Sequence, residues 1–237
     1  MRLAGAVVAA ACASCTGGTP NFEYPWDHRG VLCSAGLDDY DHEPPWDRIA
    51  DGLDAAAVNG WVAIAHTHAP GKNVSIATLE RVLDMAEERA LPFVTFRELE
   101  TSEPHAGFAL AFDDNAVASW LSVRDLLAAH GAHVTFFVSR WTLLSDEDRD
   151  DVRLLASDGH DLQPHSINHL HATEYVAEHG LDAYMNDEVL PSFEALDAEG
   201  YPPTTFAYPF GDHDDAIDEA ILAHVAHVRT TLGTCPY

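Results

Sequence analysis

Short apolar strands alternate with amphipathic helices along most of this sequence, and that alternation limits the fold more than any other feature. Apolar segments predict strands at 61–65, 93–96, 108–112, 133–138, 204–208 and 227–231. Apolar residues three and four positions apart predict helices at 46–57, 75–89, 117–130, 145–159, 181–198 and 214–224. Strands that alternate with helices run parallel, so the pattern indicates a doubly wound sheet or a barrel.

The charge balance narrows the range of partners. The chain of 237 residues has 12 Lys and Arg against 39 Asp and Glu, which gives a formal net charge of −27. Nucleic acid and anionic membrane surfaces would repel such a chain, so we exclude both as partners. The hydrophobic share of 47% is that of an ordinary globular protein. An acidic surface also suits concentrated salt, which screens self-repulsion.

The first twenty residues differ in composition from the rest. Arg2 precedes an apolar run at 3–11, which is too short to cross a bilayer as a helix and is typical of an export signal. Small residues before Cys15 resemble a bacterial lipobox, so we expect cleavage there and a lipid anchor on Cys15. A plain signal peptide cut near Ala13 is the alternative. We therefore divide the chain into a leader at 1–20 and one domain at 21–237, exported to the cell surface or periplasm.

Two cysteines remain beyond this leader, Cys33 and Cys235. In an exported protein they have two possible states. A disulfide between them would close a long loop, worth about 4–5 kcal/mol in the chain-entropy model. Two free buried thiols are the other possibility.

Candidate site residues follow two of the predicted strands, and parallel α/β folds have their sites at such strand ends. Asp113 and Asp114 come directly after the strand at 108–112. Taken alone, they can also be helix-capping acids, which are common in so acidic a chain. The strand at 204–208 leads into a turn at Phe210, where backbone N–H groups can face a ligand.

A pair of histidines has metal-ligand spacing. Pro164 suits the first turn of a helix, and His165 and His169 would then lie on one face of that helix. Side chains so placed are close enough to share a metal ion. Because the chain has 15 histidines, a chance pair is the alternative explanation.

The order of these segments resembles that of the polysaccharide deacetylases of the NodB-homology type, carbohydrate esterase family 4. The segments are F-D-D at 112–114, T-F-F-V at 135–138, H-S-x-x-H at 165–169 and F-A-Y-P-F-G at 206–211. The resemblance spans about 60 to 231. I-A-H-T-H at 64–68, upstream of the D-D pair, is similar to the circularly permuted branch that deacetylates poly-N-acetylglucosamine.

The resemblance implies a fold and a metal site. The expected fold is a distorted (β/α) barrel of about seven parallel strands. Asp114, His165 and His169 would bind a divalent metal, with zinc favoured and cobalt, nickel or manganese as alternatives. Three protein ligands leave open positions for water and substrate, as in catalytic sites.

The remaining catalytic roles also follow from the resemblance. Asp113 would be the general base that takes a proton from water. The backbone N–H of Phe210 would stabilise the oxyanion. His66 would protonate the departing amine, and His68, two residues further on, is the alternative donor.

Two positions depart from the family pattern. Asn115 stands where glycine usually follows the aspartates, although Asn tolerates a left-handed backbone. Ala207 stands where many members have the arginine that orients the catalytic base. Arg29 and Arg97 are our candidates for replacing that charge.

These expectations combine into a hydrolase that removes N-acetyl groups from an acetylated amino-sugar polymer, acting as a monomer. Trp26 and Trp46 are candidates for lining a glycan groove. One alternative is a catalytically impaired glycan-binding protein on the same barrel. Another is a metal-dependent amidase that acts on small non-sugar amides.

Overall fold

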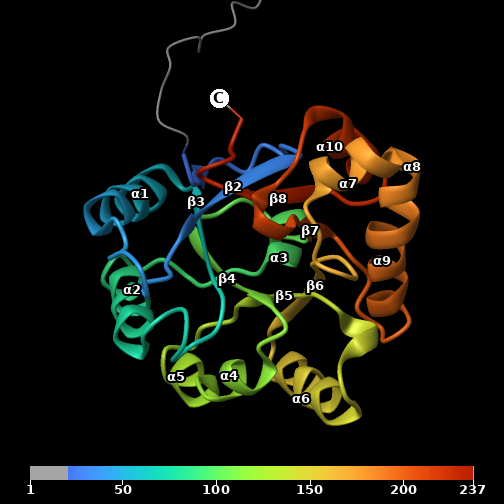
Figure 1. The fold of residues 1–237 in the computed structure, drawn as a ribbon. Coiled ribbons are helices and arrows are strands. Elements are labelled where there is room, and N and C mark those ends of the chain that lie inside the picture. The colour runs from blue at the N-terminus through green and yellow to red at the C-terminus, as the bar shows by residue number, and fades with distance from the viewer. Residues whose placement is uncertain (1–20, 237) are drawn as a thin grey trace, which may run out of the picture.

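A ring of seven parallel strands forms the centre of the computed structural model, which describes residues 21–236 (Figure 1). The strands are β2 (Val31–Gly36), β3 (Val62–Thr67), β4 (Gly107–Asp114), β5 (Thr135–Val138), β6 (Asp161–Pro164), β7 (Thr205–Ala207) and β8 (His227–Thr231). Their order around the ring is β6-β5-β4-β3-β2-β8-β7. A short strand, β1 (Glu23–Tyr24), pairs antiparallel with β3. The predicted distorted (β/α) barrel is therefore confirmed.

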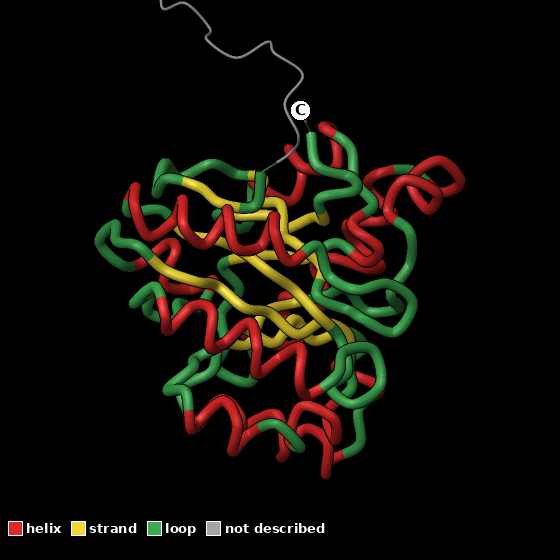
Figure 2. Tube along the Cα trace, turned by 90° about the vertical axis from the view of Figure 1, so that its left-hand side faces the viewer, coloured by secondary structure: helices red, strands yellow, loops and turns green. Residues whose placement is uncertain are grey.

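Helices surround this ring on the outside (Figures 1 and 2). The α-helices are α1 (Trp46–Asn59), α2 (Ile76–Glu88), α3 (Phe96–Thr101), α4 (Val117–Leu121), α5 (Arg124–Ala129), α6 (Asp146–Ser157), α7 (Ala172–His179), α8 (Leu181–Tyr184), α9 (Leu190–Asp197) and α10 (Asp215–Leu222). Short helical turns are η1 (Trp141–Leu143), the π-helix η2 (Met185–Val189) and η3 (Pro209–Gly211). No helix among residues 21–236 is long and apolar enough to cross a bilayer.

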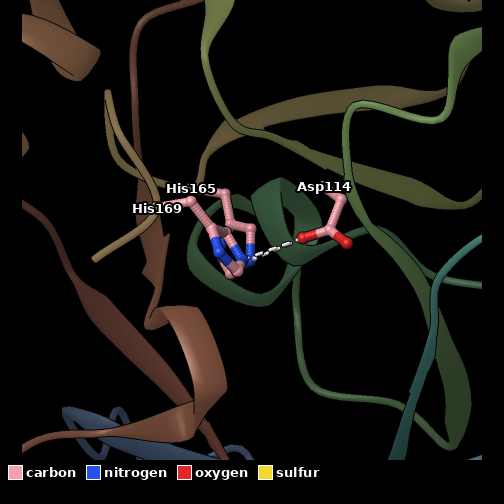
Figure 3. A group of neighbouring side chains, drawn as sticks. All are labelled: Asp114, His165 and His169. Atoms are coloured by element: carbon pink, nitrogen blue, oxygen red, sulfur yellow. Dashed lines mark ion pairs between the residues drawn. The ribbon is translucent and has the colours of Figure 1, made fainter. Parts of the chain in front are cut away.

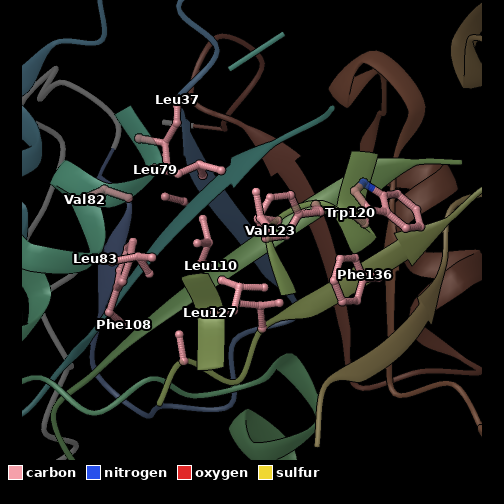
Figure 4. Close-up of a cluster of buried hydrophobic side chains, with 14 of the residues drawn as sticks. Leu37, Leu79, Val82, Leu83, Phe108, Leu110, Trp120, Val123, Leu127 and Phe136 are labelled. Atoms are coloured by element: carbon pink, nitrogen blue, oxygen red, sulfur yellow. The ribbon is translucent and has the colours of Figure 1, made fainter. Parts of the chain in front are cut away.

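Alternating side chains of each strand face two different cores. On β4, Phe108, Leu110 and Phe112 point outward into the layer between strands and helices. Figure 4 shows this layer around Trp120 and Phe136. Ala109 and the next alternate residues point into the barrel instead. The inner face is therefore filled largely by apolar side chains.

Side chains, instead of a backbone ladder, join β6 to β7 where the ring would otherwise stay open. Oε1 of Gln163 accepts hydrogen bonds from the backbone N–H groups of Thr204, at 2.9 Å, and Thr205, at 3.0 Å. Nδ1 of His165 is 2.8 Å from the carbonyl oxygen of Ala207. The barrel is therefore nearly closed, and one of its closing residues is a predicted metal ligand.

The two ends of the barrel differ. Helix α3 lies within the ring of strands in Figure 1 and covers the end where the strands begin. Its Phe96 packs against Phe137, and Arg97 forms an ion pair with Asp161 at the start of β6. The opposite end, where the strands finish, is left for a site.

A disulfide joins Cys33 on β2 to Cys235, with Cα atoms 5.7 Å apart. Of the two states considered for these cysteines, the structure has the disulfide. The lipid anchor expected on Cys15 lies outside the described residues.

Three local predictions were wrong. No strand was predicted before residue 61, but β2 lies there and its inner and outer faces are both buried. Residues 93–96 form only an isolated bridge, at Phe93, before α3 begins. Pro164 ends the strand β6 instead of starting a helix, so His165 and His169 lie in the loop that follows. Polar residues on the inner face of β6 hide its strand pattern.

Candidate active site

A cavity of about 290 Å³ opens at the ends of the strands. It is lined by Asp113, Asp114, His66, His165, His169 and Phe210, together with Asp38, His68 and Arg229. The first six are the residues predicted from sequence, so the fold brings all of them to one place. The last three add charged and titratable groups around them.

Asp113 forms a buried ion pair inside the barrel. It lies two residues after Ala111 on β4 and therefore shares the inward face of that strand. Oδ2 accepts a hydrogen bond from Nη2 of Arg229 at 2.6 Å, and both side chains are almost fully buried. Burial alone would raise the pKa of Asp113, but the charge of Arg229, together with the nearby imidazoles of His165, His66 and His68, holds that pKa below its usual value. Oδ1 of Asp113 has no hydrogen-bond partner among the described residues.

Arg229 replaces the charge that Ala207 lacks. The two residues are register partners on the neighbouring strands β7 and β8. Ala207 is buried in the inner core, where its small side chain leaves space, and the guanidinium of Arg229 lies 5.1 Å from the ring centre of Phe137 there. The arginine therefore approaches Asp113 from the strand beside the expected one.

Three side chains converge to form a candidate metal centre (Figure 3). One ligand atom each from Asp114, His165 and His169 lies within 4.8 Å of the others. Oδ1 of Asp114 is 2.9 Å from Nε2 of His169 and 3.6 Å from Nε2 of His165. Burial would raise the pKa of Asp114, but the two imidazoles outweigh it and hold that pKa well below its usual range.

The donor atoms of this centre suit a metal ion. His165 donates its Nδ1 proton to the carbonyl of Ala207, which leaves the lone pair of Nε2 facing Asp114. Oδ1 of Asp114 is buried and accepts no hydrogen bond, although two imidazoles are beside it. Converging lone pairs repel one another unless a cation lies between them. Two imidazoles and a carboxylate form a donor set that zinc accepts.

Left-handed backbone shapes the walls of this site. Asp114 has a φ of 82°, Ser166 of 64°, His169 of 62° and Phe210 of 60°. Such conformations cost energy for residues other than glycine and persist where surrounding contacts enforce them. The N–H of His169, for example, donates to Oγ of Ser166 at 3.0 Å. Two of the three candidate ligands thus depend on enforced backbone geometry.

His66 is buried and held neutral. Its Nδ1 is 2.8 Å from Oγ of Ser34, whose hydroxyl donates to the carbonyl of Thr230. The hydroxyl therefore accepts the Nδ1 proton of the imidazole. Burial, together with the charge of Arg229, lowers the pKa of His66 to about 3. An imidazole with this pKa does not carry a second proton at neutral pH.

His68 has the opposite electrostatic environment. Its Nδ1 is 2.5 Å from Oδ2 of Asp38, and the other carboxylate oxygen of Asp38 accepts a hydrogen bond from Thr67. Burial would lower the pKa of His68, but the bond to Asp38 and the charges of Asp113 and Asp114 outweigh it and raise it to about 9. His68 is therefore protonated at neutral pH and faces the same cavity.

Phe210 separates this cavity from a second hollow of about 410 Å³, which also shares His169. The Phe210 side chain is 54% exposed, and its ring stacks on that of His171 with centroids 3.9 Å apart. The accessible surface thus continues from the candidate metal centre onto an aromatic platform.

Four sequence candidates lie elsewhere. Arg29 pairs with Asp27, and Arg97 pairs with Asp161 at the covered end of the barrel, so neither reaches Asp113. Nε1 of Trp26 donates to the carbonyl of His105, which precedes β4 and places Trp26 at that covered end as well. Trp26 therefore lies away from the cavity at Asp113 and Asp114, and its part in lining a glycan groove stays a prediction. One face of Trp46 is covered by Arg81, at 3.9 Å.

Sequence reasoning also missed three residues that the site uses: Arg229, Asp38 and Ser34. A signal was present for Arg229, since it follows Val228 in a predicted apolar strand and buried charges are nearly always paired. Ser34 lies on β2 and Asp38 follows that strand, in a region where no strand was predicted. Because β2 was not predicted, neither residue could be assigned to the site from sequence.

The family profile of the polysaccharide deacetylases matches residues 101–227. This segment covers more than half of the chain and includes Asp113, Asp114, His165, His169 and Phe210. The chain therefore belongs to the polysaccharide deacetylase family, a class of hydrolases. No curated protein sequence matches the chain.

Solved structures show the same fold. A polysaccharide deacetylase from Bacillus cereus is similar over 72% of this chain, with 17% identity and a TM-score of 0.59. This chain spans only 57% of that protein. A de-N-acetylase from Aggregatibacter actinomycetemcomitans has 13% identity and a TM-score of 0.58, covering 72% of this chain and 94% of its own. A Streptococcus pyogenes deacetylase, solved with acetate, has 16% identity and a TM-score of 0.55, covering 70% and 89%.

The family predicted from the four motifs is thus confirmed, as is the class of enzyme. The circularly permuted branch stays a prediction. The metal, the substrate and the individual catalytic roles belong to the proposal that follows.

Proposed function

We propose that this protein is an exported, metal-dependent deacetylase that hydrolyses N-acetyl groups of an N-acetylhexosamine polymer. One observation carries the proposal. A candidate metal centre and a carboxylate held ionised by Arg229 share a single cavity, in adjacent residues Asp113 and Asp114. Hydrolysis of an amide needs both an electrophilic centre and a base for water, and this pair supplies both positions.

Each role can be assigned to a particular atom. A divalent cation held by Asp114, His165 and His169 supplies Lewis acidity toward water and the acetamido oxygen. Oδ1 of Asp113, which has no hydrogen-bond partner among residues 21–236, accepts the proton of the attacking water. The backbone N–H of Phe210, a residue of the cavity wall, would donate to the developing oxyanion.

His68, instead of the favoured His66, is our candidate for the proton donor. An acid that protonates the leaving amine must carry its proton at neutral pH. The pKa of about 9 meets that need for His68, and the pKa of about 3 does not meet it for His66. We assign His66 to the support of the cavity wall through Ser34.

The extent of the accessible surface favours a polymer. An acetamido group needs only the cavity beside Asp114, whereas the hollow beyond Phe210 adds space on the order of a further sugar unit. The stacked rings of Phe210 and His171 offer an aromatic surface at that position. An amidase for small non-sugar amides would leave this extension without a use.

Arg229 weakens the alternative of an inactive glycan-binding protein. Ala207, where the family arginine is absent, and Asn115 are the two features that support this alternative. Arg229, its register partner, supplies the missing charge to Asp113. We therefore retain Asn115 as the sole departure from the family pattern that has no compensation.

Acetate release tests the function directly. Wild type, Asp113→Asn and Asp125→Asn are compared on acetylated glucosamine oligomers of increasing length with zinc, cobalt, nickel or manganese present. We expect Asp113→Asn to lower the rate by about 10²–10⁴-fold, because a general base contributes that much. The exposed Asp125 on α5 is the matched control and should leave the rate unchanged. No acetate from the wild type with any of these metals would refute the enzymatic proposal.

The choice of proton donor has its own test. His68→Gln and His66→Gln are compared on the same oligomer, with metal content measured for each. We expect His68→Gln to lower kcat by about 10²-fold or more. A larger loss of kcat in His66→Gln, at equal metal content and folding, would reverse the assignment.

A further inference from the structure

A π-helix lies behind the candidate metal centre. Helices α8 and α9 are joined through η2, a wider turn whose hydrogen bonds reach one residue further than in an α-helix. Such turns often occur at functional sites. The residue of η2 that contacts the loop before His169 is Glu188, which is 1% exposed.

Glu188 holds the loop that carries His169. Its Oε2 accepts the backbone N–H of Asn168 at 2.8 Å, and its Oε1 accepts the side-chain amide of the same residue at 2.6 Å. Its backbone carbonyl accepts the N–H of Ile167 at 3.2 Å. Three hydrogen bonds from one buried residue therefore fix the backbone immediately before His169.

That backbone needs external support. Ser166 and His169, on either side of the clamped pair, both have left-handed φ values, 64° and 62°, without being glycine. A loop of this kind relaxes unless surrounding contacts enforce it. If it relaxed, Nε2 of His169 would leave its position 2.9 Å from Asp114.

We propose that Glu188 is a positioning residue for the metal centre, which acts through Asn168 to hold His169 in its ligating conformation. The inference rests on the proposed function only in assuming that the centre binds a divalent metal. In this proposal the π-helix η2 has a function, because both the carboxylate and the backbone carbonyl of Glu188 contact the same loop. Partners that orient metal ligands typically affect metal affinity by about 10–100-fold.

Cobalt binding to the full domain, measured from its visible absorption, tests this without any substrate. Glu188→Met removes both carboxylate oxygens and keeps a side chain of similar length. We expect the Kd for Co²⁺ to rise about 10–100-fold. Glu188→Gln should rescue binding to within about 3-fold, because its amide and that of Asn168 can reorient to keep both contacts. Asn168→Ala, at an exposed position, removes one of the three hydrogen bonds to Glu188 and should raise Kd by a smaller factor.

Ser192→Ala is the matched control. Ser192 is equally buried on α9, but its hydroxyl donates to the carbonyl of Val189 and not to the loop. It should lower thermal stability and leave the Kd for Co²⁺ unchanged. If Glu188→Met does not fold, the comparison of Asn168→Ala with Ser192→Ala decides the question.

Several outcomes would overturn the inference: unchanged Co²⁺ affinity in Glu188→Met or Asn168→Ala, equal loss in Ser192→Ala, or no Co²⁺ binding by the wild type. A wild type that binds Co²⁺ and releases no acetate would instead refute the proposed function alone. The two failures are therefore distinguishable.

Discussion

Replacing Arg229 with Met should move the pH dependence of catalysis. The substitution removes the guanidinium that lies 2.6 Å from Asp113 and leaves a buried carboxylate without its partner. For unit charges about 4 Å apart at an effective dielectric constant of about 20, the lost attraction is about 4 kcal/mol. Because one pKa unit corresponds to about 1.36 kcal/mol, the pKa of Asp113 should rise by as much as about 3 units.

The assay is kcat/KM for acetate release measured from about pH 4 to pH 9 in metal-saturated protein. A general base must be ionised, so activity falls about tenfold per pH unit below its pKa. The acidic limb of the wild type should lie at low pH, because the charge of Arg229 helps to hold the pKa of Asp113 below its usual value. In Arg229→Met the limb should move to higher pH by as much as about 3 units.

Two further variants show whether the effect belongs to this pair. Arg229→Lys keeps a positive charge and should shift the limb less. Arg97→Met breaks the ion pair with Asp161 at the covered end of the barrel and should leave the limb in place. A folded Arg229→Met enzyme with the acidic limb of the wild type would show that Arg229 does not keep Asp113 ionised.

Other predictions concern stability. The folded-state pKa of about 9 for His68 exceeds the unfolded 6.5, so its stabilisation is complete below pH 6.5 and is lost as the pH rises through 9. In metal-free protein, His68→Gln should therefore lower the free energy of unfolding at pH 6, by up to about 3 kcal/mol, and much less at pH 10. Urea unfolding at both pH values measures this, and equal losses would contradict it. Replacing Cys33 and Cys235 with Ser should lower the free energy of unfolding by about 2–5 kcal/mol in the same assay, whereas an unchanged midpoint would show that the disulfide adds no stability. Gln163→Leu leaves the backbone N–H groups of Thr204 and Thr205 without their acceptor and should cost about 2–4 kcal/mol; a cost near zero would mean that the contact between β6 and β7 does not need Gln163.

The motif residues were predictable because each of them follows a strong local signal. Asp113 and Phe210 come after apolar strands, and parallel strands bring their ends together at one end of a barrel. The strand alternation itself needed no motif. Local sequence was therefore sufficient for a parallel α/β fold, and the resemblance to the family selected the barrel and six residues of the cavity.

The remaining features depend on pairing between distant strands. Arg229 is opposite Ala207 only through the register of β7 and β8, and no local pattern encodes that register. Strand β6 has Asp161 and Gln163 on its inner face, because these side chains bind Arg97 and the backbone of β7. Because these side chains are polar, the segment lacks the apolar pattern of a strand. The backbone conformation around His165 was therefore not predicted correctly.

The disulfide has a consequence for the order of the chain. Cys33 lies on β2, the first parallel strand, and Cys235 follows β8, the last one, which inserts between β2 and β7. The bond joins residues 202 positions apart, so nearly the whole barrel lies inside one covalent ring. A chain opened in another loop and joined at this point would contain the same circle of strands. The disulfide therefore closes nearly all of the barrel into one covalent loop. This architecture does not specify which strand must come first in the chain.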